Sequence, residues 1–584
     1  MLSHGFRAHP FISGHAVPFL AGLFMVSAVL MEGSTPVQAQ NHDMMDHSGH
    51  NMGMSMGDSL VWQMPPMIMS MPMSADMMDD LPIVMPFLPG HGLDPAMYPE
   101  AKPSEIIDMA DGDTLRMDAS LVRRTLLGKD YVMMAYGGMY PGPLLRADRG
   151  AKVIVEFTNN IEMPTTVHWH GLRLDNAFDG VPGVTQPPVL TGETFTYELK
   201  FPDTGMYWYH PHMREDVQQD LGLYGNMLVD PVEEGFYGPV NREVPFIVDD
   251  ILLDPNSGLT PYGESGPTHA LMGRFGNVLL VNGTTDYKLA AKKGEVVRFY
   301  LTNVANTRTF NLVFGGAKIK IVASDVSKYE REQMVGSVVI APAERYIVDV
   351  LFDKEGDFRI TNTIQAVDHY RGVFVPEVQP LGMVKVSGES VQPNLASAFG
   401  DLRVNQDVID DIDRFRPFLD KAPDHSVRLT VKVHDLPRWI VRMMEIDTLY
   451  VPPMEWNDAM PMMNWLSSSE QVDWIIRDEA TGKESMDINW QWKIGDMVKI
   501  RIFNDPRSFH PMHHPFHVHG QRYLITHMDG VPTNNLVWKD TAIVPVGATM
   551  DILVDVTNPG TWMAHCHIAE HLHSGMMLSF TVSE

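Results

Sequence analysis

Gly150-Ala151-Lys152-Val153-Ile154-Val155-Glu156-Phe157-Thr158-Asn159 is the stretch that decides the fold of this chain. Apolar and polar side chains alternate through it, and a period of two marks a half-buried β-strand. The same pattern returns from Gly294 to Asn303 and again from Gly495 to Asn504. Copies that lie so far apart in the sequence indicate repeated domains rather than a solenoid.

A second repeat supports the same register. The stretches Gly192 to Gly205, Ala343 to Gly356 and Gly547 to Gly560 each enclose a strand, a turn and the start of a further strand at one common spacing. Five and seven residues past the closing glycine stand two side chains of one type: His210 and His212, Thr361 and Thr363, or His565 and His567. The middle copy therefore keeps the pattern without the histidines.

These repeats predict an all-β chain of three Greek-key β-sandwich domains. A length of 584 residues with 44% hydrophobic residues suits several packed domains. We place domain 1 at 102–235, domain 2 at 236–390 and domain 3 at 425–584. Residues 391–424 are acidic and polar, with some helical spacing from Val408 to Leu419, and we expect them to be a linker without chemistry.

The first residues have the form of a secretory signal peptide. Arg7 precedes an apolar run from about Ala16 to Met31, and Pro36-Val37-Gln38-Ala39 offers small residues for cleavage after Ala39. The run is short for a membrane span, and no Arg-Arg pair precedes it, so a twin-arginine signal is not indicated. We expect residues 1–39 to be removed and the protein to be periplasmic or secreted, without stable membrane insertion.

Residues 40–101 form a Met- and His-rich arm. Twelve Met and three His lie between Asn41 and Asp80. Such a composition builds no core and predicts disorder in the absence of a ligand. Thioethers are soft donors that suit Cu(I), so we expect an arm that captures copper. A flexible tether that merely tolerates methionine is the alternative.

Charge and cysteine content narrow the function. The formal net charge of −29 argues against nucleic acid and anionic membranes as partners and favours cations. A single cysteine excludes an intrachain disulfide, so this thiol is free to be a ligand.

That cysteine lies in His565-Cys566-His567-Ile568-Ala569-Glu570-His571-Leu572-His573-Ser574-Gly575-Met576. Cys566, His571 and Met576 supply three of the four ligand types of a blue-copper site, which binds two His, a thiolate and a distant thioether. In an extended strand His565 and His567 point away from Cys566, toward a second metal site.

The other candidate ligands come in pairs two residues apart. They are His168 with His170, His210 with His212, and His517 with His519, and His514 lies three residues before the last pair. This spacing places two imidazoles on one face of a strand. An isolated pair of this kind is weak evidence for metal, whereas several such pairs with a lone cysteine are strong evidence.

In order and spacing these segments resemble the multicopper oxidase family of laccases, ascorbate oxidases and bacterial cuprous oxidases, over roughly residues 103–584. The resemblance implies domains of the cupredoxin type and four coppers, with a trinuclear cluster shared by domains 1 and 3 and domain 2 as a spacer. The implied ligands are, for the type 1 copper, His514, Cys566, His571 and Met576; for the type 2 copper, His168 and His517; and for the two type 3 coppers, His170, His210 and His567 with His212, His519 and His565.

The resemblance also implies the reaction. A reducing substrate would give single electrons to the type 1 copper near His514 or His571, one of which should have an exposed ring edge. The electrons would pass through Cys566 to the cluster, where O2 is reduced to water. Asp179 would relay protons, with a turn Asp before Gly180 as the alternative. Leu572 stands where some bacterial relatives have a second acid, and Asp540 is expected to be structural.

The substrate is the open question. Methionines cluster in domain 3, at Met443, Met444, Met454, Met460, Met462, Met463 and Met512. They favour an oxidase of Cu(I) that also oxidises phenols, although methionine is also a common core residue. We expect it to be a monomer that acts in copper tolerance. One alternative is a laccase that acts chiefly on phenols or aromatic amines. The other is a copper carrier without enzymatic activity, which would need no complete cluster.

Overall fold

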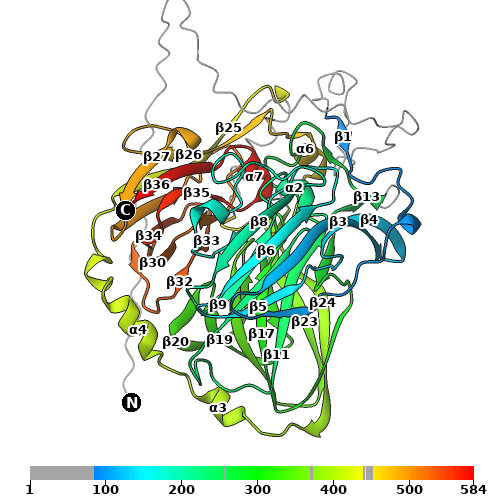
Figure 1. The fold of residues 1–584 in the computed structure, drawn as a ribbon, viewed down its shortest axis with the longest axis vertical. Coiled ribbons are helices and arrows are strands. Elements are labelled where there is room, and N and C mark those ends of the chain that lie inside the picture. The colour runs from blue at the N-terminus through cyan, green and yellow to red at the C-terminus, as the bar shows by residue number, and fades with distance from the viewer. Residues whose placement is uncertain (1–83, 255–257, 369–371, 439–440, 442–451) are drawn as a thin grey trace, which may run out of the picture. The chain divides into compact units, whose positions relative to one another are not determined.

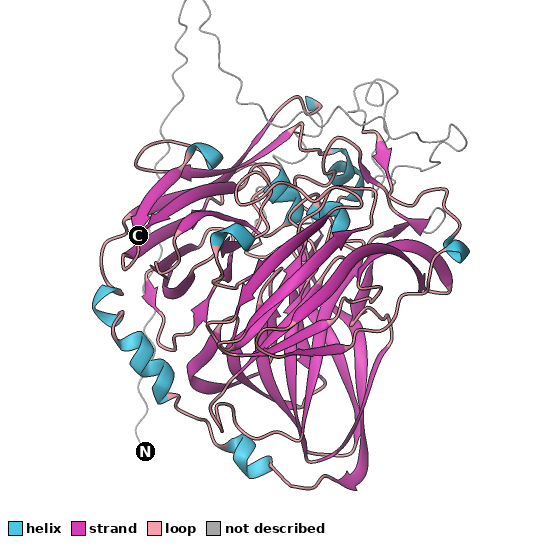
Figure 2. Ribbon diagram, viewed as in Figure 1, coloured by secondary structure: helices cyan, strands magenta, loops and turns pink. Residues whose placement is uncertain are grey.

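The computed structural model of the chain describes residues 84–254, 258–368, 372–438, 441 and 452–584. The predicted signal peptide, most of the Met-rich arm and two of the methionines, Met443 and Met444, lie outside the described residues. Strands dominate the described part, with a few short helices between them (Figure 2). No helix in this part is long and apolar enough to cross a bilayer.

The first sandwich has two sheets, most of whose strands are labelled in Figure 1. The five-stranded sheet has the order β2 (Ile106–Met109), β5 (Leu144–Asp148), β10 (Gly225–Asp230), β9 (Gly205–His210) and β7 (His168–His170). The four-stranded sheet has the order β4 (Lys129–Tyr136), β3 (Thr114–Leu126), β6 (Lys152–Asn159) and β8 (Thr194–Lys200).

The second sandwich repeats this plan with longer strands. Its six-stranded sheet has the order β15 (Val278–Val281), β11 (Arg242–Ile251), β17 (Glu295–Asn303), β22 (Arg345–Phe352), β19 (Lys318–Ser324) and β20 (Ser327–Val335). Its five-stranded sheet has the order β16 (Tyr287–Lys293), β24 (Val373–Ser390), β23 (Gly356–Asp368), β18 (Phe310–Phe314) and β21 (Val338–Ile340).

The third sandwich has a seven-stranded and a five-stranded sheet. The larger runs β26 (Val472–Asp478), β25 (His425–Val433), β28 (Met497–Asn504), β34 (Thr549–Asp555), β30 (Arg522–Met528) and β31 (Val531–Pro532), with β32 (Trp538–Lys539) also on β30. The smaller runs β27 (Asn489–Lys493), β36 (Met577–Ser583), β35 (Gly560–Cys566), β29 (His514–Val518) and β33 (Thr541–Val544).

Short elements connect these sheets. Two ribbons pair β1 (Pro86–Phe87) with β14 (Tyr262–Gly263), and β12 (Leu253–Asp254) with β13 (Gly258–Leu259). The α-helices are α2 (Glu215–Gln218), α3 (Ala396–Gly400), α4 (Gln406–Asp413), α6 (Pro461–Leu466) and α7 (Ala569–His573). The 3-10 helices are η2 (Pro95–Met97), η3 (Asn176–Phe178), η4 (Arg416–Phe418) and η5 (Ser485–Asp487). The segment predicted to be a linker thus holds α3, α4 and η4.

The quoted repeat forms the same central strand three times. β6, β17 and β28 each pair in parallel with an earlier strand, β3, β11 or β25, and antiparallel with a later one, β8, β22 or β34. In each of these strands every second side chain is buried in the core of its own sandwich. The predicted all-β fold of repeated sandwiches is therefore confirmed.

The asparagine that closes each repeat has one structural task. Asn159, Asn303 and Asn504 are buried, and each Nδ2 donates to two backbone carbonyl groups that come later in the chain. A buried amide with several partners holds such a corner in one conformation. Asn504 binds the carbonyl groups of Met512 and Val544, and so it ties down the approach to His514.

Candidate metal centre

A sulfur and two imidazoles meet inside the third sandwich. Cys566 ends β35, His514 begins β29 and His571 lies in α7. The Sγ atom of Cys566 lies 3.5 Å from Nδ1 of His514 and 3.8 Å from Nδ1 of His571, and these two nitrogens are 3.3 Å apart. Met576 is fully buried, and its backbone bonds to the N–H of Cys566 and the carbonyl of His571. The loop that carries these residues is thus closed on itself.

The chemistry of this triad suits a soft metal ion. Burial raises the pKa of the Cys566 thiol and lowers the pKa values of His514 and His571. The imidazoles are therefore neutral and ready to coordinate, and a positive ion is what would make a thiolate favourable here. Two His nitrogens and one Cys sulfur are the equatorial ligand set of blue-copper sites.

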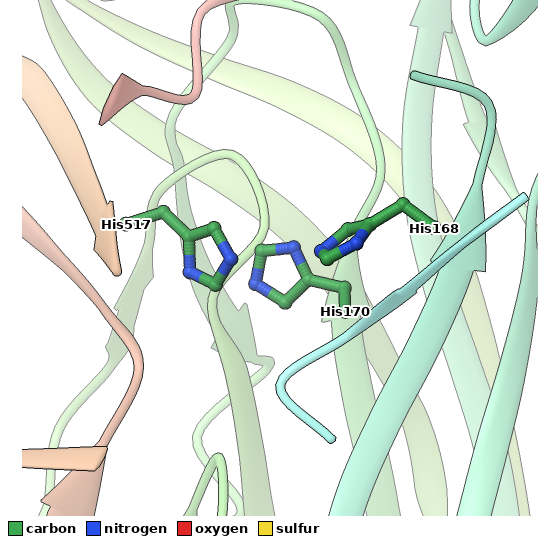
Figure 3. A group of neighbouring side chains, drawn as sticks. All are labelled: His168, His170 and His517. Carbon is green, nitrogen blue, oxygen red and sulfur yellow. The ribbon is translucent and has the colours of Figure 1, made fainter. Parts of the chain in front are cut away.

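Eight histidines meet where the first and third sandwiches face each other. In the first sandwich His168 of β7 lies opposite His210 of β9, and in the third His517 of β29 lies opposite His565 of β35. The rings of the two sandwiches interleave, with centroids 3.7 Å apart for His170 and His517. Figure 3 shows His517 approaching His168 and His170 from the opposite side.

The ring atoms form three compact groups. In each group one ligand atom per residue lies within 4.8 Å of the others. The groups are His168, His170 and His517; His170, His210 and His567; and His212, His519 and His565. The second and third are the two predicted type 3 sets, and the first contains the predicted type 2 pair.

Unpartnered nitrogens point into this cluster. The Nε2 atoms of His168, His212 and His517 and the Nδ1 atom of His170 are buried without a hydrogen-bond partner. On their opposite ring atoms His168 and His517 bond to the carbonyl groups of Asp179 and Asp540. Buried bare nitrogens are costly unless something binds them, and outer partners that orient the rings are typical of metal ligands. The residues present fit a copper cluster.

The protonation state of the cluster histidines also suits metal binding. Burial, aided by neighbouring rings, lowers the pKa values of His170, His210, His517 and His565, and that of His519. The pKa values of His212 and His567 fall to about 3, chiefly through burial. Neutral imidazoles are the form that coordinates metal ions.

One expectation about the triad is wrong. Neither imidazole has an exposed ring edge, because His514 is 1% and His571 0% exposed. The Trp474 ring covers His571 at a centroid distance of 4.2 Å, and its Nε1 donates to the carbonyl of Ala270 in the middle sandwich. The N–H of Leu271 in turn bonds to Ser467 after α6. The sequence could not show that a segment of another domain covers this site.

Asp179 lies at the cluster, as predicted. Its Oδ2 atom is 2.9 Å from Nδ1 of His519, and its Oδ1 atom is 3.4 Å from Nδ1 of His168. Although burial raises it, these two histidines bring the pKa of Asp179 below its ordinary value. The turn interpretation holds as well, because a Cβ atom on Gly180 would lie 2.0 Å from the carbonyl oxygen of Val167. Asp179 thus combines a turn with contacts to both sandwiches.

Two other acids touch the cluster. The Oδ1 atom of Asp540, expected to be structural, lies 3.1 Å from Nε2 of His170, and the Thr541 hydroxyl lies 2.9 Å from the same nitrogen. Glu215, which the sequence analysis missed, lies 3.1 Å from Nδ1 of His212 and is paired with His573. Its position three residues after His212 was the available signal. Leu572 packs among apolar side chains and brings no acid.

Comparison with known proteins agrees with this geometry. Three family models, each described as multicopper oxidase, match residues 120–234, 245–376 and 456–584. Multicopper oxidase MmcO of Mycobacterium tuberculosis is 28% identical, over 76% of this chain and 82% of that protein. Laccase-1 of Botryotinia fuckeliana is 27% identical, over 80% and 81%.

The fold is shared with solved structures. The multicopper oxidase of Campylobacter jejuni, described as a metallo-oxidase, superposes with a TM-score of 0.63 and 22% identity, covering 86% of this chain and 99% of that one. Its likeness supports the three-sandwich fold. The matched segments span all three sandwiches and contain the copper-type triad and the histidine cluster. The chain is therefore an oxidoreductase of the multicopper oxidase family.

Proposed function

We propose that this protein takes single electrons from a small reducing substrate at a copper bound by His514, Cys566, His571 and Met576, and delivers them to dioxygen at a cluster bound by the eight histidines. Bound copper would supply the one-electron redox centres and the site that binds dioxygen. The observation that carries the proposal is strand β35, where Cys566 faces the triad and the neighbouring His565 faces the cluster.

The chain itself supplies the connection between the two sites. Cys566 is covalently joined to His565 and His567, whose rings lie against His212 and His210 of the first sandwich. The path from sulfur to imidazole is on the order of 10–15 Å through bonds of the strand. Because these groups are buried and hydrogen-bonded, the connection is rigid and excludes water.

Reduction of dioxygen also consumes protons. We propose Asp179 as the residue that passes them, because its two carboxylate oxygens lie beside the outer ring nitrogens, Nδ1, of His168 and His519 at the edge of the cluster. A general acid must lie within hydrogen-bond reach of the group that it serves, and the Asp179 carboxylate meets this condition for the His519 ring at 2.9 Å.

The covered triad bears on the substrate. A phenol that stacks on an exposed imidazole edge has no such edge here, because Trp474 and the segment with Ala270 and Leu271 lie over His571. We therefore favour Cu(I) over phenols as the reductant. Met462, Met463 and Met512 are buried in the core of the third sandwich, so they support packing more directly than metal transfer.

Oxygen uptake with Cu(I) and with a phenol, on the full protein and on a variant without residues 40–80, tests this preference. We expect faster uptake with Cu(I), and a further loss when the Met-rich arm is removed. Phenol turnover far above Cu(I) turnover would instead favour a laccase. A copper count near four per chain with an intense thiolate–copper absorption would support the site assignment and exclude the simple carrier.

The place and role in the cell are also proposals. The predicted signal peptide supports a periplasmic or secreted location. We further propose that the protein acts there as a monomer that protects against copper. N-terminal sequencing of the exported protein should find Gln40 first, and growth in copper should depend on the intact triad.

A further inference from the structure

Arg345 of the middle sandwich reaches into both metal-binding sandwiches. It begins β22, and its side chain is fully buried. Its Nε atom donates to the carbonyl of Met206 in the first sandwich at 2.9 Å. Its Nη1 and Nη2 atoms donate to the two carboxylate oxygens of Asp540 in the third, at 2.6 and 2.5 Å. One guanidinium therefore joins all three sandwiches.

Asp540 carries this connection to the cluster. Its Oδ1 atom lies 3.1 Å from Nε2 of His170, and its carbonyl oxygen lies 2.9 Å from Nδ1 of His517. The Thr541 hydroxyl, which also bonds to Asp540, lies 2.9 and 3.0 Å from the same two nitrogens. Arg345 is thus one residue removed from two predicted ligands that come from different sandwiches.

Gly171 shows that this arrangement shapes the ligand loop. It follows His170 directly, with φ at +87°, a conformation that favours glycine. A Cβ atom at this position would lie 2.5 Å from Oδ2 of Asp540 and 2.8 Å from Nη2 of Arg345. The loop after His168 and His170 can therefore pack on the Arg345–Asp540 pair only because it carries no side chain here.

The bidentate geometry explains why an arginine stands there. Its planar fork fixes the direction of a carboxylate, whereas a lysine holds it through a point charge. Asp325 lies 3.5 Å from Arg345, and Lys539 lies 3.1 Å from Asp325, so the buried charges are paired on every side. A buried network of this kind has a single low-energy arrangement when every member is satisfied.

We propose that Arg345 is a positioning residue for the copper cluster: by fixing Asp540 it sets the rings of His170 and His517, so the sandwich without metal ligands helps to build the metal site. The inference rests on the proposed function, since the cluster must bind copper for the alignment to matter. Outer residues that orient metal ligands typically change metal affinity about 10–100-fold when replaced.

The test compares Arg345→Lys with Arg298→Lys. Arg298 forms an equally buried two-pronged pair with Asp349 in the same sandwich, at 2.8 and 3.0 Å, and neither residue touches the cluster. Both variants keep the positive charge and lose the fork. Copper content after dialysis, the spin-resonance spectrum, the thiolate–copper absorption and the thermal unfolding of copper-free protein are measured for each.

We expect R345K to bind cluster copper about 10–100-fold more weakly and to show an altered type 2 spin-resonance signal. Its thiolate–copper absorption should stay normal, because the network does not contact Cys566, His514 or His571. R298K should unfold at a lower temperature but keep wild-type copper content and spectra. Wild-type copper content and spectrum in R345K, or an equal copper loss in R298K, would overturn the inference.

Asp540→Asn provides a second route should R345K fail to fold. It keeps the side-chain size and removes the charge that Arg345 holds, so we expect the same loss of cluster copper. The double variant should lose no more than either single one, because both changes break one connection. Normal cluster copper in D540N overturns the inference. A wild-type protein without cluster copper would instead overturn the proposed function itself.

Discussion

The outer sandwiches carry histidine, and the middle one threonine, at the first and third positions of one tripeptide. His210-Pro211-His212, Thr361-Asn362-Thr363 and His565-Cys566-His567 follow the same repeat. Thr361 lies opposite Val313, where the outer sandwiches pair His210 with His168 and His565 with His517. The middle sandwich keeps its sheets and core without these ligands. The fold therefore does not need the metal, and a few side chains at strand ends decide where metal binds.

The middle sandwich has kept a part in the site nonetheless. At the positions of the missing histidines, the hydroxyl groups of Thr361 and Thr363 bond to each other at 3.1 Å. From other positions it supplies Arg345 to Asp540 and the Ala270 carbonyl to Trp474, which covers His571. It is more than the spacer that the sequence suggested, because it contacts supports of both sites.

Replacing the cysteine tests the comparison most severely. Cys566→Ser removes the soft ligand, so we expect loss of the thiolate–copper absorption and of oxygen uptake to the background rate. Asn362→Ser, at the matching position of the middle sandwich, should cost stability but leave both signals, since the Asn362 side chain bonds to Asn311 and Gln379 of neighbouring strands in the same sandwich. Oxygen uptake that persists in C566S would contradict the view that the tripeptide of the third sandwich carries the metal site.

Asp179 and Asp540 provide the next test, because each contacts one histidine of each outer sandwich. Arg345 pairs with Asp540, and no arginine pairs with Asp179 among the residues that the structure describes. We expect Asp179→Asn to slow oxygen uptake by about 10²–10⁴-fold, the range for a positioned proton donor, while copper content stays normal. Loss of copper in D179N, as expected for D540N, would make Asp179 a positioning residue instead.

Removal of copper by a chelator should lower the local stability of the outer sandwiches and leave that of the middle sandwich unchanged. Ligand binding at 1,000 times Kd stabilises a fold by about 4 kcal/mol, so the copper-free protein should unfold at a lower temperature. Hydrogen exchange should quicken in β7 and β29, which carry ligands, and stay unchanged in β17 and β23 of the middle sandwich. Faster exchange throughout the middle sandwich would show that its stability also depends on the metal.

The sequence predicted the sandwich fold and named the candidate ligands that the structure groups together, because both depend on local patterns. Period two marked β6, β17 and β28, and the His spacing marked strand faces. It could not predict Arg345 or the cover over His571, because these contacts join residues far apart in the chain, 195 positions for Arg345 and Asp540. Such contacts leave no periodic signal in a single sequence.

The smallest expected effect concerns the asparagines that the three sandwiches share. Asn159→Ala, Asn303→Ala and Asn504→Ala each remove an amide that donates to two backbone carbonyl groups, which should cost about 2–3 kcal/mol of unfolding free energy in every case. Urea unfolding of the copper-free variants measures this cost. Only N504A should also change the thiolate–copper absorption, because Asn504 holds Met512 and Val544 beside His514. An equal spectral change in N303A would mean that the sandwiches transmit strain to the triad, and that their shared corner does more than stabilise each one separately.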